Sequence, residues 1–187
     1  MGNILLLMAS ILMARYVSIN INKKDKIGRT SLFYACIRGD DAIVKYLVEH
    51  GANVKKKDKE DKTPLYNACY SGNEAAVKYL VELGADVNET ANNGNSPLHN
   101  AFFRGKETIV KYLVEHEADV NKTNKWDITP LHNACIRGDQ AIVKYLVEHE
   151  ADVNKIDYRN RTSLFYARLR RNGALVKYLI EHEAKCK

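Results

Sequence analysis

Apolar and polar residues follow the same order in five consecutive stretches of the chain, each 33 residues long. In the second half of the first stretch, Val44, Leu47 and Val48 lie three and four positions apart. This spacing places them along one side of an α-helix, so the pattern predicts an amphipathic helix there. The same helix is expected at 76–83, 109–116, 142–149 and 175–182.

The first half of each stretch predicts a shorter helix. In the second stretch it starts with Thr-Pro-Leu-Tyr-Asn-Ala at 63–68. The threonine hydroxyl can cap the helix, and proline suits the first helical position because its missing N–H needs no partner. Leu65, Ala68 and Cys69 then fall on one side of the helix. Gly72 is the expected end, since glycine adopts the left-handed conformation without a steric penalty.

The same six-residue phrase returns without insertion or deletion from Thr30 onward. Its copies lie at 30–35, 63–68, 96–101, 129–134 and 162–167. A fixed period of this size indicates one structural unit stacked on copies of itself. We therefore expect one continuous body made of five repeats, at 25–57, 58–90, 91–123, 124–156 and 157–187.

The unit resembles the ankyrin repeat family over residues 18–187. The resemblance rests on Thr-Pro-Leu-His-Asn-Ala at 129–134 and Gly-Ala-Asp-Val-Asn at 84–88. It implies an all-α solenoid of stacked helix-turn-helix units with protruding hairpin-like loops. It also implies a non-enzymatic protein that binds another protein on a concave face of loops and first helices. His99 and His132 would then form hydrogen bonds between repeats.

The first 24 residues fit the unit only in part. Residues 4–14 are apolar except for Ser10, a stretch too short to span a bilayer as a helix. Residues 18–22 align with the end of a repeat. We expect a degenerate N-terminal capping helix and loop at 1–24. A cleaved targeting segment and a start fused onto a truncated repeat are the alternatives.

The fifth repeat departs from the others at positions that matter for stacking. Ser163 and Phe165 replace the proline and histidine of the phrase, and Arg168 takes the position of Cys69. A charge at a stacking position would be costly if another repeat followed. We therefore expect this repeat to be the C-terminal cap, with a polar outer face.

The cysteines and histidines do not indicate a catalytic or metal site. Equivalent residues in stacked helices lie about 8–10 Å apart, which is too far for Cys36, Cys69 and Cys135 to form disulfides. They are expected to be small buried side chains in a reducing compartment, the cytoplasm, with the nucleus as the alternative. Equivalent histidines are likewise too far apart to share zinc. No enzymatic activity, metal or cofactor is expected.

Positions that vary between repeats are the candidates for binding a partner. Arginine recurs at the end of the first helix in four repeats, with Ser71 as the exception, and an apolar residue precedes this position in every repeat. Exposed aromatic side chains beside arginines are typical of protein interfaces. The predicted partner-binding residues are Ile37, Arg38, Tyr70, Phe103, Arg104, Trp126, Ile128, Ile136, Arg137, Tyr158, Arg159, Leu169 and Arg170.

Trp126 is the expected anchor for an acidic and apolar partner, with the protein itself a monomer. The alternative is that these side chains pack against adjacent loops and that the arginines are solvated. The unvarying tyrosines of the second helices are expected to be structural packing instead. They are Tyr46, Tyr79, Tyr112, Tyr145 and Tyr178.

Two other functions are open at this stage. The net charge of +6, with lysines at 23, 24, 55–57 and 59 and a basic last repeat, allows binding to a polyanion such as nucleic acid. No nucleic-acid motif supports this, so a nucleic-acid partner is the less favoured hypothesis. Asn88, Asn121 and Asn154 also resemble ankyrin asparagines that an asparaginyl hydroxylase can modify.

Overall fold

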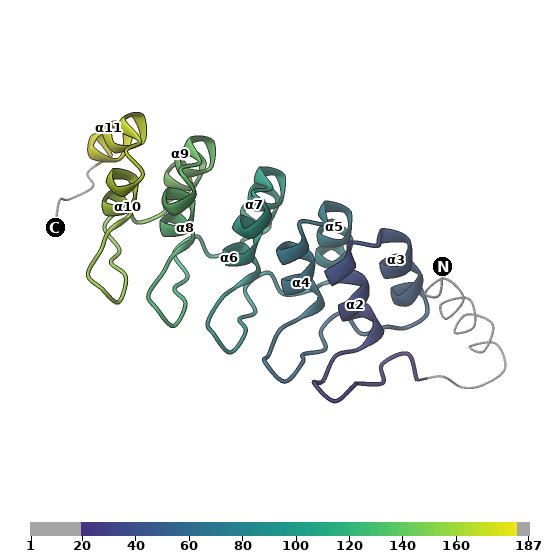
Figure 1. The fold of residues 1–187 in the computed structure, drawn as a ribbon. Helices are drawn as coiled ribbons and strands as arrows, with labels where there is room; N and C mark the ends of the chain where they lie inside the picture. The colour runs from purple at the N-terminus through teal and green to yellow at the C-terminus, as the bar shows by residue number, and fades with distance from the viewer. Residues whose placement is uncertain (1–19, 183–187) are drawn as a thin grey trace.

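The computed structural model describes residues 20–182, and most of the predicted N-terminal cap lies outside this range. Within it, ten α-helices form five consecutive pairs, one inside each 33-residue interval (Figure 1). The pairs are α2 (Ser31–Arg38) with α3 (Asp41–Glu49), α4 (Pro64–Ser71) with α5 (Glu74–Glu82), α6 (Pro97–Ala101) with α7 (Glu107–Glu115), α8 (Pro130–Arg137) with α9 (Gln140–Glu148), and α10 (Ser163–Leu169) with α11 (Gly173–Glu181).

The helix pairs stack in a row, and the connecting loops protrude from one side of it (Figure 1). First helices pack on first helices, as α2 on α4 and α8 on α10, and second helices pack on second helices, as α5 on α7. Over residues 20–182 the only pairing of strand type is an isolated bridge between Ile156 and Thr162. The prediction of an all-α solenoid is therefore confirmed.

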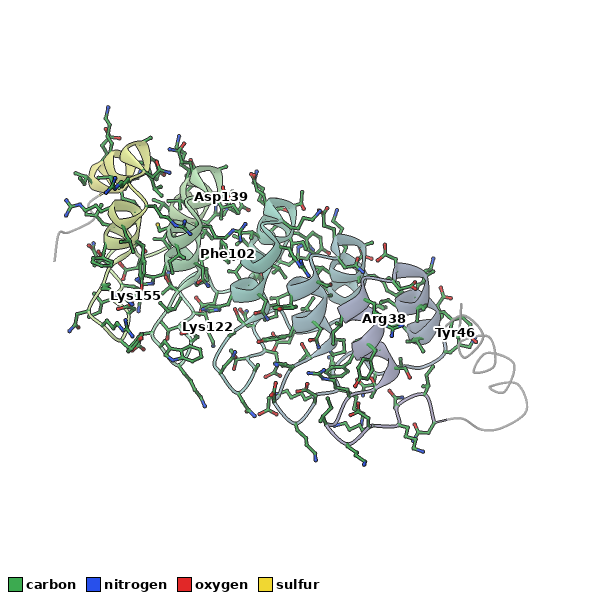
Figure 2. All side chains as sticks on the ribbon, viewed as in Figure 1. Arg38, Tyr46, Phe102, Lys122, Asp139 and Lys155 are labelled. Carbon is green, nitrogen blue, oxygen red and sulfur yellow. The ribbon has the colours of Figure 1, made fainter. Side chains whose placement is uncertain are left out.

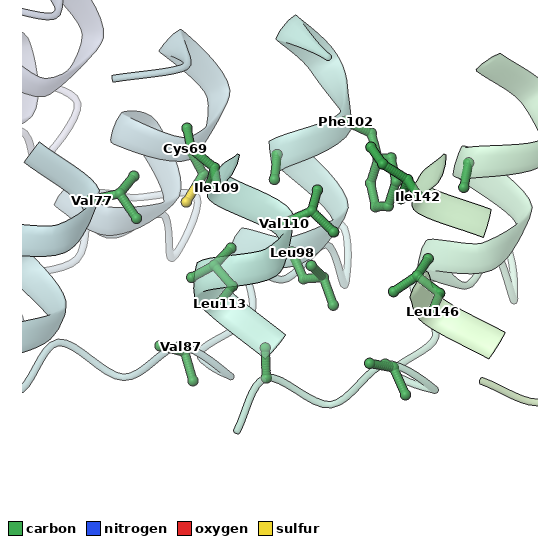
Figure 3. Close-up of a cluster of buried hydrophobic side chains, with 14 of the residues drawn as sticks. Cys69, Val77, Val87, Leu98, Phe102, Ile109, Val110, Leu113, Ile142 and Leu146 are labelled. Carbon is green, nitrogen blue, oxygen red and sulfur yellow. The ribbon is translucent and has the colours of Figure 1, made fainter. Parts of the chain in front are cut away.

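One hydrophobic core runs through the stack because every repeat buries the same positions. Leu80, Leu113 and Leu146 are fully buried at equivalent places in α5, α7 and α9 (Figure 3). The cysteines at 36, 69 and 135 are free and buried, as predicted. Burial raises the pKa of Cys36 and of Cys135 to about 12, so both thiols stay protonated at neutral pH.

Three of the five first helices start as the sequence predicts. The hydroxyls of Thr63, Ser96 and Thr129 cap the first helices of the three inner repeats. The prediction is wrong for Thr30 and Thr162, which make no capping hydrogen bond with their side chains. Both precede serine instead of proline, whose fixed φ presets the start of a helix.

The first helix of the third repeat is broken. Helix α6 has five residues and continues as a 3₁₀ helix, η1 (Phe102–Arg104), where the other first helices have seven or eight α-helical residues. Phe102 fills the position of the cysteines and is buried (Figure 3). The N-cap of α7 is Lys106, which makes no side-chain cap, whereas the other second helices begin at a capping Asp or Asn.

Two glutamates occupy a left-handed backbone position that glycine fills in the first two repeats. Glu117 and Glu150 have φ of 65° and 67°, while Gly51 and Gly84 have φ of 89° and 79°. A side chain makes this conformation costly for an L-residue, whereas glycine adopts it freely. The two glutamates therefore hold a strained backbone conformation.

We expect Glu117→Gly to raise the free energy of unfolding by about 1 kcal/mol, because it removes that backbone strain. Urea unfolding followed by circular dichroism would measure the gain. Lys45→Gly, at an exposed interior position of α3, is the control and should lose about 1 kcal/mol. A loss of stability in both variants would contradict the assignment of strain to Glu117.

Candidate protein-binding face

In every repeat except the third, which has Ala91, an acidic or amide side chain at the first position shapes the loop. In the fourth repeat the Asn124 Oδ1 accepts hydrogen bonds from the backbone N–H groups of Trp126 at 2.9 Å and Ile128 at 3.1 Å. In the fifth, the Asp157 Oδ1 does the same for Arg159 and Arg161. Such Asx turns fix the loop without help from neighbouring secondary structure.

Backbone hydrogen bonds join each loop tip to the next. The N–H of Lys59 donates to the carbonyl of Ile27 at 3.0 Å, and the N–H of Tyr158 donates to the carbonyl of Trp126 at 3.1 Å. Equivalent bonds run from Asn92 to Glu60 and from Lys125 to Asn93. The five tips therefore form one continuous row, so side chains on different loops keep fixed positions relative to one another.

The structure brings the predicted aromatic residues together at the C-terminal part of this row. Trp126 is 47% exposed and Tyr158 is 52% exposed, on adjacent linked loops. The Arg159 guanidinium lies 5.0 Å from the centre of the Tyr158 ring, in cation–π contact. Ile128 is half-buried, and its carbonyl accepts a hydrogen bond from the preceding repeat.

The predicted arginines lie at equivalent ends of the first helices and are exposed, and Figure 2 labels the first of them, Arg38, at the end of α2. Three of them rest on the preceding repeat. Gly72 lies directly against Arg104, because a Cβ placed on this glycine would come within 2.9 Å of the Arg104 Cβ. Gly105 lies against Arg137 in the same way, since a Cβ placed on it would come within 2.5 Å of an Nη atom of Arg137.

Arg170 also contacts the preceding repeat, because its Nε donates a hydrogen bond to the carbonyl of Ile136. Ser71, which replaces arginine in the second repeat, donates from its Oγ to the carbonyl of Cys36 at 2.8 Å. Carbonyls at the C-terminal end of a helix lack partners within the helix and carry partial negative charge. A cation there stabilises the helix end, so the arginines have a structural use as well.

The predicted apolar positions beside the arginines are less uniform. Ile37 and Ile136 are half-buried, Tyr70 is 38% exposed and Leu169 is 68% exposed. The backbone of Phe103 lies in η1, and its side chain is outside the described part of the structure. Exposure therefore varies along this row, and among the described side chains it is largest at Leu169 in the last repeat.

A buried carboxylate in the last repeat was not foreseen from the sequence. The Asp157 Oδ2 accepts from the Arg161 guanidinium at 2.7 Å and from the hydroxyl of Tyr166 at 2.5 Å. Burial opposes ionisation, but these bonds and the backbone donors hold the pKa of Asp157 well below its ordinary value. In the first repeat, Tyr34 donates to Asp25 in the same way at 2.6 Å.

One sequence feature could have predicted this contact. Only the first and fifth repeats combine an aspartate at the start of the loop with Phe-Tyr in the six-residue phrase. The predicted set also leaves out several exposed apolar side chains, two of which lie on a loop tip and a first helix. Ile27 is 47% exposed at the first loop tip, and Phe165 is 41% exposed on α10.

The histidines of the phrase connect neighbouring repeats, as the resemblance implied. The Nε2 atoms of His99 and His132 lie 3.0 and 3.2 Å from the carbonyl oxygens of Ile128 and Arg161. Both rings are buried, and this burial lowers the pKa of each histidine below its ordinary value of 6.5.

We expect the free energy of unfolding to fall as the pH drops below about 6.5. In that range the unfolded chain protonates these histidines while the folded chain resists protonation, so the unfolded state binds more protons. Urea unfolding between pH 5 and 7.5 would measure the slope. The double variant His99→Gln and His132→Gln should flatten it. An unchanged slope in that variant would contradict the assignment to these two residues.

The second helices carry a regular packing pattern. The tyrosine of each described pair stacks on the histidine four residues later, as in Tyr112 and His116 with ring centres 4.0 Å apart. A lysine of the preceding repeat covers the tyrosine ring, as Lys78 does for Tyr112 at 5.7 Å. Tyr46 lies on this side of the molecule, on α3 (Figure 2). This packing favours the structural interpretation of the tyrosines.

Other kinds of site find no support in the described part of the chain. Residues 20–182 contain no group of three or more histidine, cysteine or acidic side chains placed to hold a metal ion. None of the helices between these residues is long and apolar enough to cross a membrane.

Stacked helix pairs with a continuous core and a row of linked, protruding loops define a helical repeat protein of the solenoid class. The family model for ankyrin repeats in three copies matches residues 4–91, 55–124 and 98–187. The chain therefore belongs to the ankyrin repeat family. A comparison with curated proteins gives no match. Ankyrin repeats are generally modules for protein–protein interaction, and the family is typically non-enzymatic.

Proposed function

We propose that this protein binds a partner protein, as a monomer, across its concave face of loop tips and first-helix ends. The observation that carries the proposal is the row of loop tips joined by backbone hydrogen bonds, which presents exposed Trp126 and Tyr158 beside Arg159. Aromatic residues and arginine are the types that contribute most to binding at protein interfaces. Because the tips are already ordered, little entropy is lost when a partner binds.

The charge of this face favours a partner with acidic as well as apolar side chains. Arg38, Arg104, Arg137 and Arg170 are all exposed at the first-helix ends. Arginine forms bidentate bonds with carboxylates, and the neighbouring Leu169 offers apolar surface. We place the protein in a reducing compartment, the cytoplasm or nucleus, since its described cysteines are buried free thiols.

The test is partner capture from the native host with paired substitutions. Trp126→Ala together with Arg137→Ala should abolish capture of the partner, because the variant loses the anchor and one charge of the face. Leu83→Ala with Lys177→Ala, both exposed on second helices, is the matched control and should retain the partner. Circular dichroism should show unchanged helical content in both variants. Capture of the same partner by the Trp126 variant would refute the assignment of the face.

A polyanion is the second candidate, and the charge distribution gives it some support. Residues 1–57 contain ten Lys and Arg against four Asp and Glu, and residues 157–187 contain eight against three. Several of these cations are already paired within the protein, such as Arg29 with Asp58, Lys57 with Glu89, and Arg161 with Asp157. Binding of a DNA duplex that weakens steeply with salt would support this candidate over the protein partner.

A further inference from the structure

The exposed arginines at the first-helix ends, Arg38, Arg104, Arg137 and Arg170, form what we call the arginine row. Each occupies the same position of a 33-residue repeat, so the row has the spacing of the stacked helices, about 8–10 Å. The second repeat leaves a gap in the row, because it carries Ser71 there.

The preceding repeat contacts three of these side chains. The stem of Arg104 packs on Gly72, the guanidinium of Arg137 lies against Gly105, and Arg170 donates from Nε to the carbonyl of Ile136. A guanidinium has five N–H donors, so one bond of this kind leaves donors for a ligand. The arginine row is therefore a set of exposed cations whose backbone positions recur with the repeat.

That interval selects among the regular conformations of a bound peptide. In a β-strand, side chains on one face recur about every 6.6–6.8 Å, which is too short. In an α-helix, side chains seven residues apart are separated by about 10.5 Å along the axis. Each such step also rotates the side chain by about 20° around the axis, so successive side chains turn away from the row. A polyproline II helix has three residues per turn and a rise of 3.1 Å, so side chains three apart stay aligned about 9.3 Å apart.

A second row of the same period runs beside the arginines. Ile37, Ile136 and Leu169 directly precede Arg38, Arg137 and Arg170 in the chain. A polyproline II segment has three columns of side chains, so it can present one column to the arginines and the next column to these apolar residues. Its backbone is already extended, which limits the entropy lost on binding.

We propose that the arginine row binds a partner segment in the polyproline II conformation that carries an acidic side chain at every third residue. This proposal rests on the proposed function and specifies the partner that the same face accepts. Each arginine would take one carboxylate, and the intervening prolines or apolar residues would lie along Ile136 and Leu169. The gap at Ser71 means that the segment engages three consecutive repeats, from Arg104 to Arg170, most strongly.

The gap at Ser71 allows a test that adds a contact instead of removing one. Ser71 and Arg170 both bond to a carbonyl near the end of the preceding first helix, so an arginine at position 71 has a carbonyl acceptor close by. Ser71→Arg should complete the row from Arg38 to Arg170. Leu83→Arg, at an exposed position at the opposite end of α5, adds the same charge away from the row and is the matched control.

The probes are two fluorescent peptides with five glutamates each, one repeating Pro-Pro-Glu and one repeating Pro-Pro-Pro-Glu. Fluorescence anisotropy with the full chain should show tighter binding of the first peptide. Ser71→Arg should raise its affinity by about two- to fivefold, and Arg137→Gln should lower it by a similar factor, the range of one exposed charge contact. Leu83→Arg should change the affinity for both peptides equally and by less.

Four outcomes would overturn the proposal. They are equal binding of the two peptides, equal gains from Ser71→Arg and Leu83→Arg, tighter binding of a helical peptide with glutamate at every seventh residue, and no binding of the Pro-Pro-Glu peptide. None of these outcomes affects the proposed function, because partner capture by the Trp126 and Arg137 variants decides that separately.

Discussion

Leu113→Ala should lower the free energy of unfolding by about 2–5 kcal/mol, the range for truncating a fully buried leucine. Leu113 lies in α7 with no exposed surface, inside the part of the core that joins the second repeat to the fourth (Figure 3). Its removal would leave a cavity at the middle of the stack. Because each repeat is stabilised mainly by its neighbours, we also expect the variant to unfold in more than one transition. Urea unfolding followed by circular dichroism would measure both effects.

The matched control is Leu83→Ala, the same chemical change at a side chain that is 44% exposed at the end of α5. A surface substitution of this kind should change the free energy of unfolding by no more than about 0.5 kcal/mol. Equal losses in the two variants would contradict a core that runs continuously through the middle repeats.

Asp157→Ala is expected to cost about 3 kcal/mol, because it removes the acceptor of a buried ion pair and leaves the Arg161 guanidinium and the Tyr166 hydroxyl without it. Two backbone N–H groups in the loop lose the same partner. The loss should be concentrated in the last repeat. Hydrogen exchange followed by mass spectrometry would show faster exchange in α10 and α11 than in α4 and α5.

The pH dependence gives an independent check on Asp157. Its folded pKa lies below the ordinary value of 3.8, so its contribution is complete above that pH and is lost as the pH falls through the folded pKa. The stability difference between the wild type and Asp157→Asn should therefore shrink below about pH 4. Asp41→Ala, at an exposed position of α3, serves as the control. A difference that stays constant down to pH 2 would contradict the role of the carboxylate.

Much of the fold could be predicted because the sequence repeats the information needed to form it. The spacing of Val44, Leu47 and Val48 predicts a second helix, and the glycine after the first helix predicts its end. Gly72 indeed takes φ of 75° at the C-cap of α4. These features depend on residues that are close in the chain, where local sterics and periodicity decide the structure.

Contacts between repeats were harder to predict, because they join residues about 33 positions apart and depend on how closely the backbones approach. The placement of Arg137 against Gly105 is one example. The bond from Tyr166 to Asp157 lies within one repeat, but it was also hard to predict, because it requires a loop geometry that no short pattern describes. For the same reason the break after α6 was missed, although Phe102 at the cysteine position was visible in the sequence.

For the candidate site, variation between repeats indicated where side chains would be exposed. It predicted Trp126 and Tyr158 correctly as exposed loop residues, but it did not distinguish half-buried Ile136 from largely exposed Leu169. Both occupy the same position of the repeat. Ile136 has the last repeat packed beside it, with Arg170 bonded to its carbonyl. A comparison of equivalent positions does not include such neighbours.

The close approach of Arg104 to Gly72 and of Arg137 to Gly105 restricts how the second, third and fourth repeats can diverge. A side chain larger than hydrogen at Gly105 would displace Arg137, so a mutation at either position changes selection on the other. Neighbouring repeats must therefore change in compensating pairs, although duplication supplies them as separate copies.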